Sequence, residues 1–152
     1  MKTIELIKLK LPEQQFKFAN IEDRTCIFDD IRQIYVAISP EEWVRQNFLK
    51  YLIIEKKYPA GLISVEAQIK TMSGVKRYDA LVCSRDGSPF MLLEFKAPNV
   101  RISQDVFSQI GVYNIGIKVK YLVVSNGLKH FCISIDYENN VFHALKNIPE
   151  YF

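Results

Sequence analysis

The sequence has few cysteines, and their placement excludes several classes of protein. Cys26, Cys83 and Cys132 are odd in number, far apart and set among apolar neighbours. The sequence has no C-x-x-C pair and no Cys/His cluster with zinc spacing, which argues against the common zinc motifs and against a disulfide framework. We therefore expect buried free thiols in a reducing compartment, and hence a cytoplasmic protein.

Long hydrophobic runs are also missing. No stretch approaches the ~18 apolar residues that a membrane span requires. The start, MKTIELIKLKLPEQQ, lacks the apolar core of a signal peptide. The formal net charge of +3 permits nucleic acid as a partner without requiring it. We expect a protein that does not associate with a membrane.

Known nucleophile motifs are absent as well. The sequence contains no Ser-His-Asp or Gly-x-Ser-x-Gly arrangement. Its two histidines, His130 and His143, lie in strand-like runs, which favours structural or surface roles. Serine-based hydrolysis is therefore not predicted.

What the chain does contain is enough for one domain with a sizeable core. It has 152 residues, 49% of them apolar and 24% charged, which is typical of a globular protein. No internal repeat, low-complexity tract or linker interrupts it. We predict a single domain over residues 1–152, with an N-terminal extension over 1–38 that holds a strand and a core over 39–145.

Periodicity predicts helices and strands in alternation. A helix is predicted from Ser39, a suitable N-cap, with Pro40 in the first position and Glu42 completing a capping box. A second helix is predicted over 103–117. Strands are predicted over 3–11, 34–38, 62–70, 77–84, 89–96, 121–125, 129–135 and 141–145. This order predicts an α/β fold, a central mixed sheet flanked by helices in the order αβββαβ.

The segment RYDALVCSRDGSPFMLLEFKAP, residues 77–98, carries charged residues within otherwise apolar strands. If Asp86 and Gly87 are the central turn residues, residue i pairs with residue 173 − i, so Asp79 lies across from Glu94. Such neighbours share a face, with Cβ atoms roughly 5 Å apart, and the period of two adds Lys96. A longer turn would shift this register by about one residue.

Two carboxylates at that separation repel each other, and burial adds to the cost of ionising both. A divalent cation offsets this cost, since Mg²⁺ takes one or two carboxylates and keeps several waters. The set Asp79, Glu94 and Lys96 therefore predicts metal-assisted phosphodiester hydrolysis. The alternative is a structural ion pair between Glu94 and Lys96, because Glu55-Lys56-Lys57 forms the same triplet at a helix end.

These residues resemble the PD-(D/E)xK nuclease superfamily, although Tyr78 stands where proline is usual. Residues 24–145 resemble the N-terminal nuclease domain of type I restriction enzyme R subunits, in a stand-alone form. The segments that carry this likeness are SPEEWVRQNFLKYLI, YPAGLISVEAQIK, KRYDALV, LLEFKAP, QIGVYN and VVSNGLKHFCISID. The resemblance implies a restriction-endonuclease-like core and DNA endonuclease activity that depends on Mg²⁺ or Mn²⁺.

The resemblance also implies roles for single residues. Lys96 would position the attacking water, and Gln109-x-x-x-Tyr113 matches a further motif of the RecB-like branch. The alternative for Gln109 and Tyr113 is a polar residue and a core tyrosine on an amphipathic helix. The metal ligands would be Asp79, Glu94 and the backbone carbonyl of Phe95.

Other charged residues are secondary candidates. A helix-borne glutamate often completes the metal site in this superfamily, and Glu42 is the candidate, although its capping position explains it without chemistry. Glu66 on the neighbouring strand is a comparable candidate, or else a surface carboxylate. Four basic residues near the predicted site would bind DNA phosphates, or else belong to solvated turns: Lys70, Lys76, Arg77 and Arg101.

The sequence contains no G-x-x-x-x-G-K-[ST] phosphate loop, whereas type I R subunits carry an ATP-driven translocase. We expect the chain to act on DNA as an independent nuclease, as a monomer or a homodimer, or with a separate recognition or motor subunit. The competing hypothesis is a catalytically silent module of the same fold that binds DNA or a protein.

Overall fold

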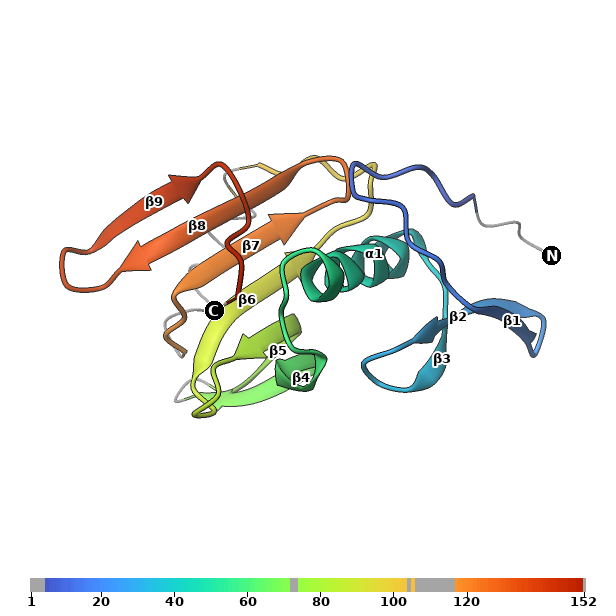
Figure 1. The fold of residues 1–152 in the computed structure, drawn as a ribbon, viewed down its shortest axis with the longest axis horizontal. Helices are drawn as coiled ribbons and strands as arrows, with labels where there is room; N and C mark the ends of the chain where they lie inside the picture. Colours follow the sequence, from blue (N-terminus) through green and yellow to red (C-terminus); the bar gives the residue numbers. More distant parts are fainter. Residues whose placement is uncertain (1–4, 72–73, 104, 106–116, 152) are drawn as a thin grey trace.

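A computed structural model describes residues 5–71, 74–103, 105 and 117–151 (Figure 1). None of the helices in those ranges has the length and apolar character needed to cross a membrane. In chain order the elements are β1 (Phe18–Ile21), β2 (Arg24–Asp29), β3 (Ile34–Ala37), α1 (Pro40–Ile54), the 3-10 helix η1 (Ala60–Leu62), β4 (Ile63–Thr71), β5 (Gly74–Cys83), β6 (Pro89–Phe95), β7 (Tyr121–Ser125), β8 (His130–Asp136) and β9 (Val141–Leu145).

Six strands form the main sheet in the order β4-β5-β6-β7-β8-β9. All neighbours are antiparallel except β6 and β7, which are parallel and therefore need a crossover connection. The helix predicted over 103–117 falls in that connection, but residues 104 and 106–116, with Gln109 and Tyr113, lie outside the described residues. The mixed β-sheet with helix α1 packed against it confirms the predicted α/β fold class.

Helix α1 begins where the sequence predicts. Ser39 has extended backbone angles, and its Oγ accepts a hydrogen bond from the Glu42 amide at 3.0 Å. Pro40 occupies the first position, where its missing N–H costs nothing. The second half of the predicted capping box is wrong, because the Glu42 carboxylate accepts hydrogen bonds from Arg32 and Arg45 instead.

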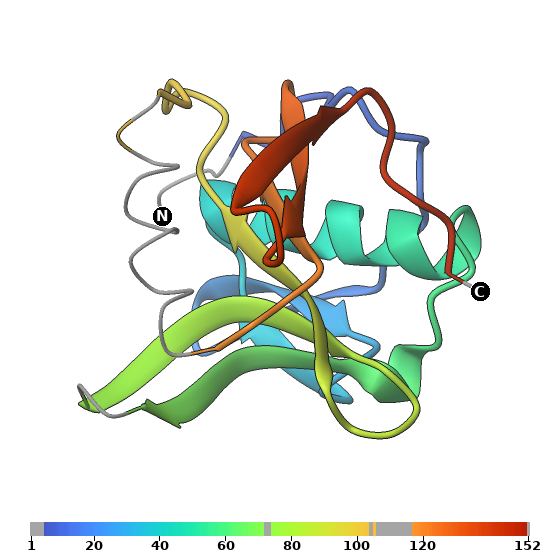
Figure 2. The ribbon, with the colours of Figure 1, turned by 90° about the vertical axis from the view of Figure 1, so that its left-hand side faces the viewer.

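The main core lies between α1 and one face of the sheet (Figure 2). Phe48 and Leu52 of α1 are fully buried against Leu93 and Phe95 of β6. Each such side chain contributes roughly 1.5–3 kcal/mol by leaving water. A second cluster covers the opposite face of the sheet, from Tyr78, Leu81, Leu92, Ile117, Val119, Leu122 and Val124.

The cysteines largely follow the sequence prediction. All three are free thiols; Cys26 and Cys132 are buried, whereas Cys83 is half-buried. Burial raises the pKa of Cys132 to about 12, so this thiol stays protonated and unreactive at neutral pH.

The N-terminal segment differs from its prediction. Residues 5–11, the described part of the predicted strand 3–11, form no strand. Leu9 is buried in the main core instead, and the Trp43 indole N–H donates to the Ile7 carbonyl at 2.9 Å. The alternating pattern thus serves packing on α1. Strands β1, β2 and β3 form a separate antiparallel sheet, of which the sequence indicated only β3.

The β5–β6 hairpin has the predicted register, but its turn is formed by other residues than predicted. Ala80 pairs with Leu93 and Val82 with Met91, so the residue numbers sum to 173 as predicted. The turn itself is displaced, since the Gly87 amide donates to the Ser84 carbonyl at 2.9 Å. A shift between Val82 and Cys83 restores the register. Two local irregularities therefore compensate each other.

Strand β5 leaves β6 after the Ala80–Leu93 pair, while it stays paired with β4 as far as Gly74. In Figure 2 these two strands extend together away from the rest of the sheet. Beyond this pair the Phe95 N–H has no backbone acceptor on β5. It donates instead to the Asp79 side chain, at Oδ2, at 2.7 Å. The branch point thus lies at Asp79.

Candidate active site

The branch point brings together the three residues predicted from the hairpin. Asp79 and Glu94 directly follow the last β5–β6 pair, Ala80–Leu93, and the Asp79 carboxylate acts electrostatically on Glu94. Lys96 follows β6, and its Nζ lies 3.7 Å from Glu94 Oε1. The Glu94 and Lys96 side chains are 25% and 30% exposed, so water and a ligand can reach them. The divergence of the strands opens the sheet at these charges.

The electrostatics of Glu94 and Asp79 oppose ionisation of both. Burial and the Asp79 carboxylate together raise the pKa of Glu94 to about 7, although Lys96 lowers it. Burial also raises the pKa of Asp79, against the Phe95 amide, Arg45 and Lys96, which lower it. A cation between these groups would relieve the cost that each carboxylate imposes on the other.

Glu41, which the sequence did not single out, is a further carboxylate close enough to this pair to interact with it electrostatically. Burial raises the pKa of Glu41, and the Asp79 carboxylate contributes to the rise. Glu42 points elsewhere: Arg45 Nε and Nη2 donate to it at 2.6 and 2.7 Å. Consecutive residues of a helix point in directions about 100° apart, so the side chains of Glu41 and Glu42 point in different directions.

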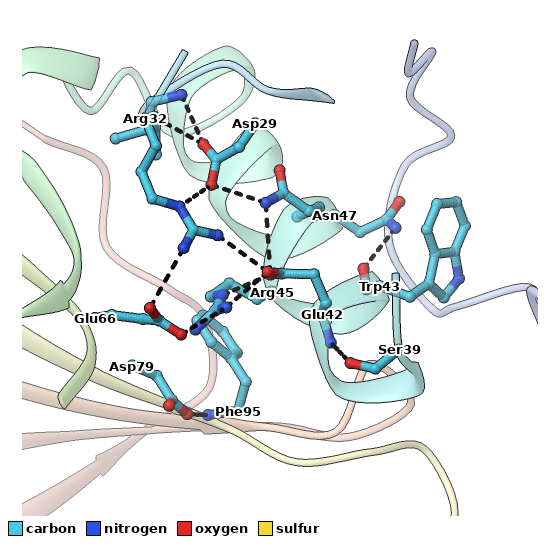
Figure 3. Close-up of polar contacts among 12 residues, drawn as sticks. Asp29, Arg32, Ser39, Glu42, Trp43, Arg45, Asn47, Glu66, Asp79 and Phe95 are labelled. Atoms are coloured by element: carbon cyan, nitrogen blue, oxygen red, sulfur yellow. Dashed lines mark hydrogen bonds and ion pairs between the residues drawn. The ribbon is translucent and has the colours of Figure 1, made fainter. Parts of the chain in front are cut away.

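Glu66 lies across from Asp79 on β4. The pairs Val65–Ala80 and Ala67–Tyr78 flank this position and fix the register. Its carboxylate is 49% exposed and lies 3.5 Å from both Arg45 Nη2 and Arg32 Nη1 (Figure 3). The three adjacent strands β4, β5 and β6 carry Glu66, Asp79 and Glu94: beyond the effect of burial, the Glu66 carboxylate raises the pKa of Asp79, and the Asp79 carboxylate raises that of Glu94. Glu66 is thus a partly exposed carboxylate of the edge strand that pairs with two arginines, and its role in a metal site stays a prediction.

Three of the four predicted basic residues, Lys70, Lys76 and Arg77, lie on the β4–β5 extension, which is the part of these two strands that continues away from β6. They divide between its two faces. Arg77 and Lys70 are exposed and, by strand alternation, share the face of Asp79 and Glu66. Lys76 is half-buried and alternates to the other face. Arg101 is exposed beyond β6. The face shared with the carboxylates thus carries two of the four predicted DNA contacts.

His130 has the structural role that its sequence context favours. Its Nδ1 lies 2.7 Å from the buried Ser125 Oγ, and its Nε2 lies 2.8 Å from the Lys10 carbonyl oxygen. The ring therefore ties the N-terminal segment to the turn between β7 and β8.

Comparison with known proteins decides the family. Residues 40–149, more than half of the chain, match the family described as type I restriction enzyme R protein N terminus. The chain belongs to this family. The resemblance of the sequence to type I R subunits is thus confirmed, whereas membership of the wider PD-(D/E)xK superfamily stays a prediction.

A solved structure agrees with the fold of this R-protein N-terminal domain. It is a fragment of a putative HsdR subunit of a type I restriction enzyme from Vibrio vulnificus, with a TM-score of 0.52 and 20% identity. The match covers 72% of this chain and 23% of that chain. No curated protein matches the chain.

The donor set of the R-protein domain fits a hydrated divalent cation. In the described part of the chain, no three His, Cys, Asp or Glu side chains gather closely enough to enclose a metal. Mg²⁺ does not require such a cage, since it takes one or two carboxylates and keeps several waters. Asp79 and Glu94 offer carboxylate oxygens for such an ion; burial raises the pKa of both groups, and the Asp79 carboxylate adds to the rise at Glu94. Oxygen ligands without His or Cys favour Mg²⁺ or Mn²⁺ over zinc.

Proposed function

We propose that this domain is a metal-dependent DNA endonuclease in which Asp79 and Glu94 hold Mg²⁺ or Mn²⁺. The observation that supports the proposal is the pair of half-buried carboxylates at the branch point, with Lys96 Nζ 3.7 Å from Glu94. A sheet built only for stability would not place two carboxylates together, because burial penalises both.

The side chains divide the chemistry among themselves. A bound divalent cation polarises a phosphoryl oxygen and lowers the pKa of a coordinated water. The Phe95 amide orients the Asp79 carboxylate by its 2.7 Å hydrogen bond. Lys96 carries three N–H donors on a flexible stem and orients the attacking water. Glu41 is a third carboxylate close to the pair, and the Phe95 carbonyl remains a candidate ligand.

The family name and the basic residues support DNA as the substrate. Restriction enzymes act on DNA, and Arg77 and Lys70 lie exposed on β5 and β4, the strands that carry Asp79 and Glu66. Such side chains bind phosphates without reading sequence. We propose that Arg101 adds a further phosphate contact and that separate recognition or motor subunits supply specificity. The roles of Gln109 and Tyr113 at the site stay predictions.

Cleavage of a supercoiled plasmid with Mg²⁺ or Mn²⁺ tests the proposal. Asp79→Ala and Lys96→Ala should each lower the rate by about 100-fold or more, because each removes a group that touches the reacting water or its cation. Lys57→Ala is the matched control, since Lys57 ends the same triplet at the far end of α1. Equal rates in wild type and both site variants would refute the proposal.

One observation favours a second candidate, a silent DNA-binding module. Glu94 already has a cationic neighbour in Lys96, so the pair can persist as a structural ion pair. This candidate predicts salt-dependent DNA binding without cleavage in any divalent metal, and an Asp79→Asn variant that is as stable as wild type or more so.

A further inference from the structure

Two arginines hold the Glu66 carboxylate from two different elements. Arg45 belongs to α1, and its Nη2 lies 3.5 Å from Glu66 Oε1. Arg32 belongs to the turn between β2 and β3, and its Nη1 lies 3.5 Å from Glu66 Oε2 (Figure 3). The turn precedes the family match, which begins at residue 40. A segment outside the matched region therefore reaches the candidate site.

Each arginine is itself fixed by a buried carboxylate. Arg32 Nε donates to Asp29 Oδ2 at 2.6 Å, and Asp29 is only 1% exposed. Arg45 donates through Nε and Nη2 to Glu42 at 2.6 and 2.7 Å. Arg32 Nη2 also donates to Glu42 at 3.0 Å, which joins the two arginines. Planar guanidinium groups bound in this way present their other N–H groups in fixed directions.

Stability does not account for the Glu66 end of this network. Ion pairs at 3.5 Å to a side chain that is 49% exposed contribute little to stability. Glu66 moreover adopts a left-handed backbone conformation, with φ of 53°, which is unfavourable for a residue with a side chain. Strained residues of this kind cluster at functional sites, where their surroundings hold them in place.

We propose that Arg32 and Arg45 are positioning residues of the site. They hold the Glu66 carboxylate across from Asp79, where it accepts hydrogen bonds from the water shell of a cation on Asp79 and Glu94. This inference rests on the proposed function. It assigns the N-terminal sheet a role in the site, because that sheet supplies Arg32.

Calorimetric titration of Mn²⁺ into the metal-free full chain tests the proposal without an activity assay. Glu66→Gln and Arg32→Gln should each weaken Mn²⁺ binding about 10–100-fold, as loss of groups that orient a metal's ligands commonly does. The double variant should bind no more weakly than Glu66→Gln alone, because Arg32 acts through Glu66. The melting temperature of each variant, without metal, shows whether it is folded.

The same turn offers a matched control. Asp30→Asn breaks the 3.5 Å ion pair between Lys50 Nζ and Asp30 Oδ2, which joins the same turn to the same helix away from Glu66. Its Mn²⁺ affinity should equal that of wild type. If Arg32→Gln fails to fold, Arg32→Lys is the second variant. Lysine keeps the positive charge beside Asp29, but its single nitrogen cannot bind Asp29 and Glu66 as the separate guanidinium nitrogens do. This variant should therefore weaken Mn²⁺ binding as well.

The outcomes separate this inference from the proposed function. Unchanged Mn²⁺ affinity in Glu66→Gln or in a folded Arg32 variant overturns the positioning role, even when wild type binds the ion and cuts DNA. Additive losses in the double variant overturn it as well. A wild-type chain that neither binds Mn²⁺ nor cuts DNA overturns the proposed function, and this inference with it.

Discussion

The raised pKa of Glu94 predicts how the stability of the metal-free protein depends on pH. Burial and the Asp79 carboxylate raise this pKa from its ordinary value of 4.5 to about 7. The folded protein therefore binds this proton more tightly than the unfolded chain does. The resulting stabilisation is fully present below pH 4.5 and is lost as the pH rises through 7. Glu94→Gln removes this dependence because glutamine does not ionise.

The size of the effect follows from the same values. A rise from 4.5 to about 7 corresponds to about 3 kcal/mol of differential interaction. The Glu94 side chain is 25% exposed, so solvent screening reduces this figure. We expect about 2–3 kcal/mol, a substantial share of the 5–15 kcal/mol of total stability that is typical of a domain.

Urea denaturation in EDTA at pH 5 and pH 8 measures this effect. Fluorescence of Trp43, the single tryptophan, follows unfolding because its indole packs on the N-terminal segment. Between the two pH values, the wild-type unfolding free energy should fall by about 1–2 kcal/mol more than that of Glu94→Gln, because part of the full effect is already lost at pH 5. Glu13→Gln, at an exposed position, should behave as wild type.

Divalent metal should reverse the loss in wild type alone. Mg²⁺ at pH 8 should raise the unfolding free energy of wild type, since the proposed Mg²⁺ site exists only in the folded state, and should raise that of Glu94→Gln much less. The same pH dependence in wild type and Glu94→Gln would refute the electrostatic argument, because the two carboxylates would then not share one half-buried site.

Two further predictions concern other parts of the molecule. Arg77→Ala should reduce the slope of log DNA affinity against log salt by about one, because it removes one phosphate contact, whereas Lys57→Ala should leave the slope unchanged. Gly127→Ala should cost about 2–4 kcal/mol in urea denaturation, since φ is 85° and a Cβ there would lie 2.6 Å from Leu9 Cδ2. Gly87→Ala, with φ of 86° and no atom within 4 Å of its Cβ, should cost only about 1–2 kcal/mol. Equal salt slopes in Arg77→Ala and Lys57→Ala would refute the first prediction. Equal losses of unfolding free energy in Gly127→Ala and Gly87→Ala would refute the second.

Local interactions determine the parts of this protein that its sequence predicts. The start of α1 depends on Ser39 and Pro40, which are neighbours in the chain. The β5–β6 hairpin likewise depends on short-range turn chemistry. Even there the predicted register is correct only because two deviations compensate: the turn is displaced by one residue, and the bulge between Val82 and Cys83 restores the pairing.

Tertiary contacts decide the rest of the site. The i,i+3 spacing of Glu42 and Arg45 already favours an ion pair within the helix, but the contact of Glu42 with Arg32 and the electrostatic effect of Asp79 on Glu41 arise only in the folded chain. The sequence equally cannot show where β5 leaves β6, because that divergence depends on strands and a helix that meet only in the folded chain. The sequence alone determined the helix N-cap and the hairpin register, and it singled out Asp79, Glu94 and Lys96 as candidates, since short-range spacing encodes these features. Only the folded structure decided which other charges join them, because those contacts span tens of residues and leave no periodic signal.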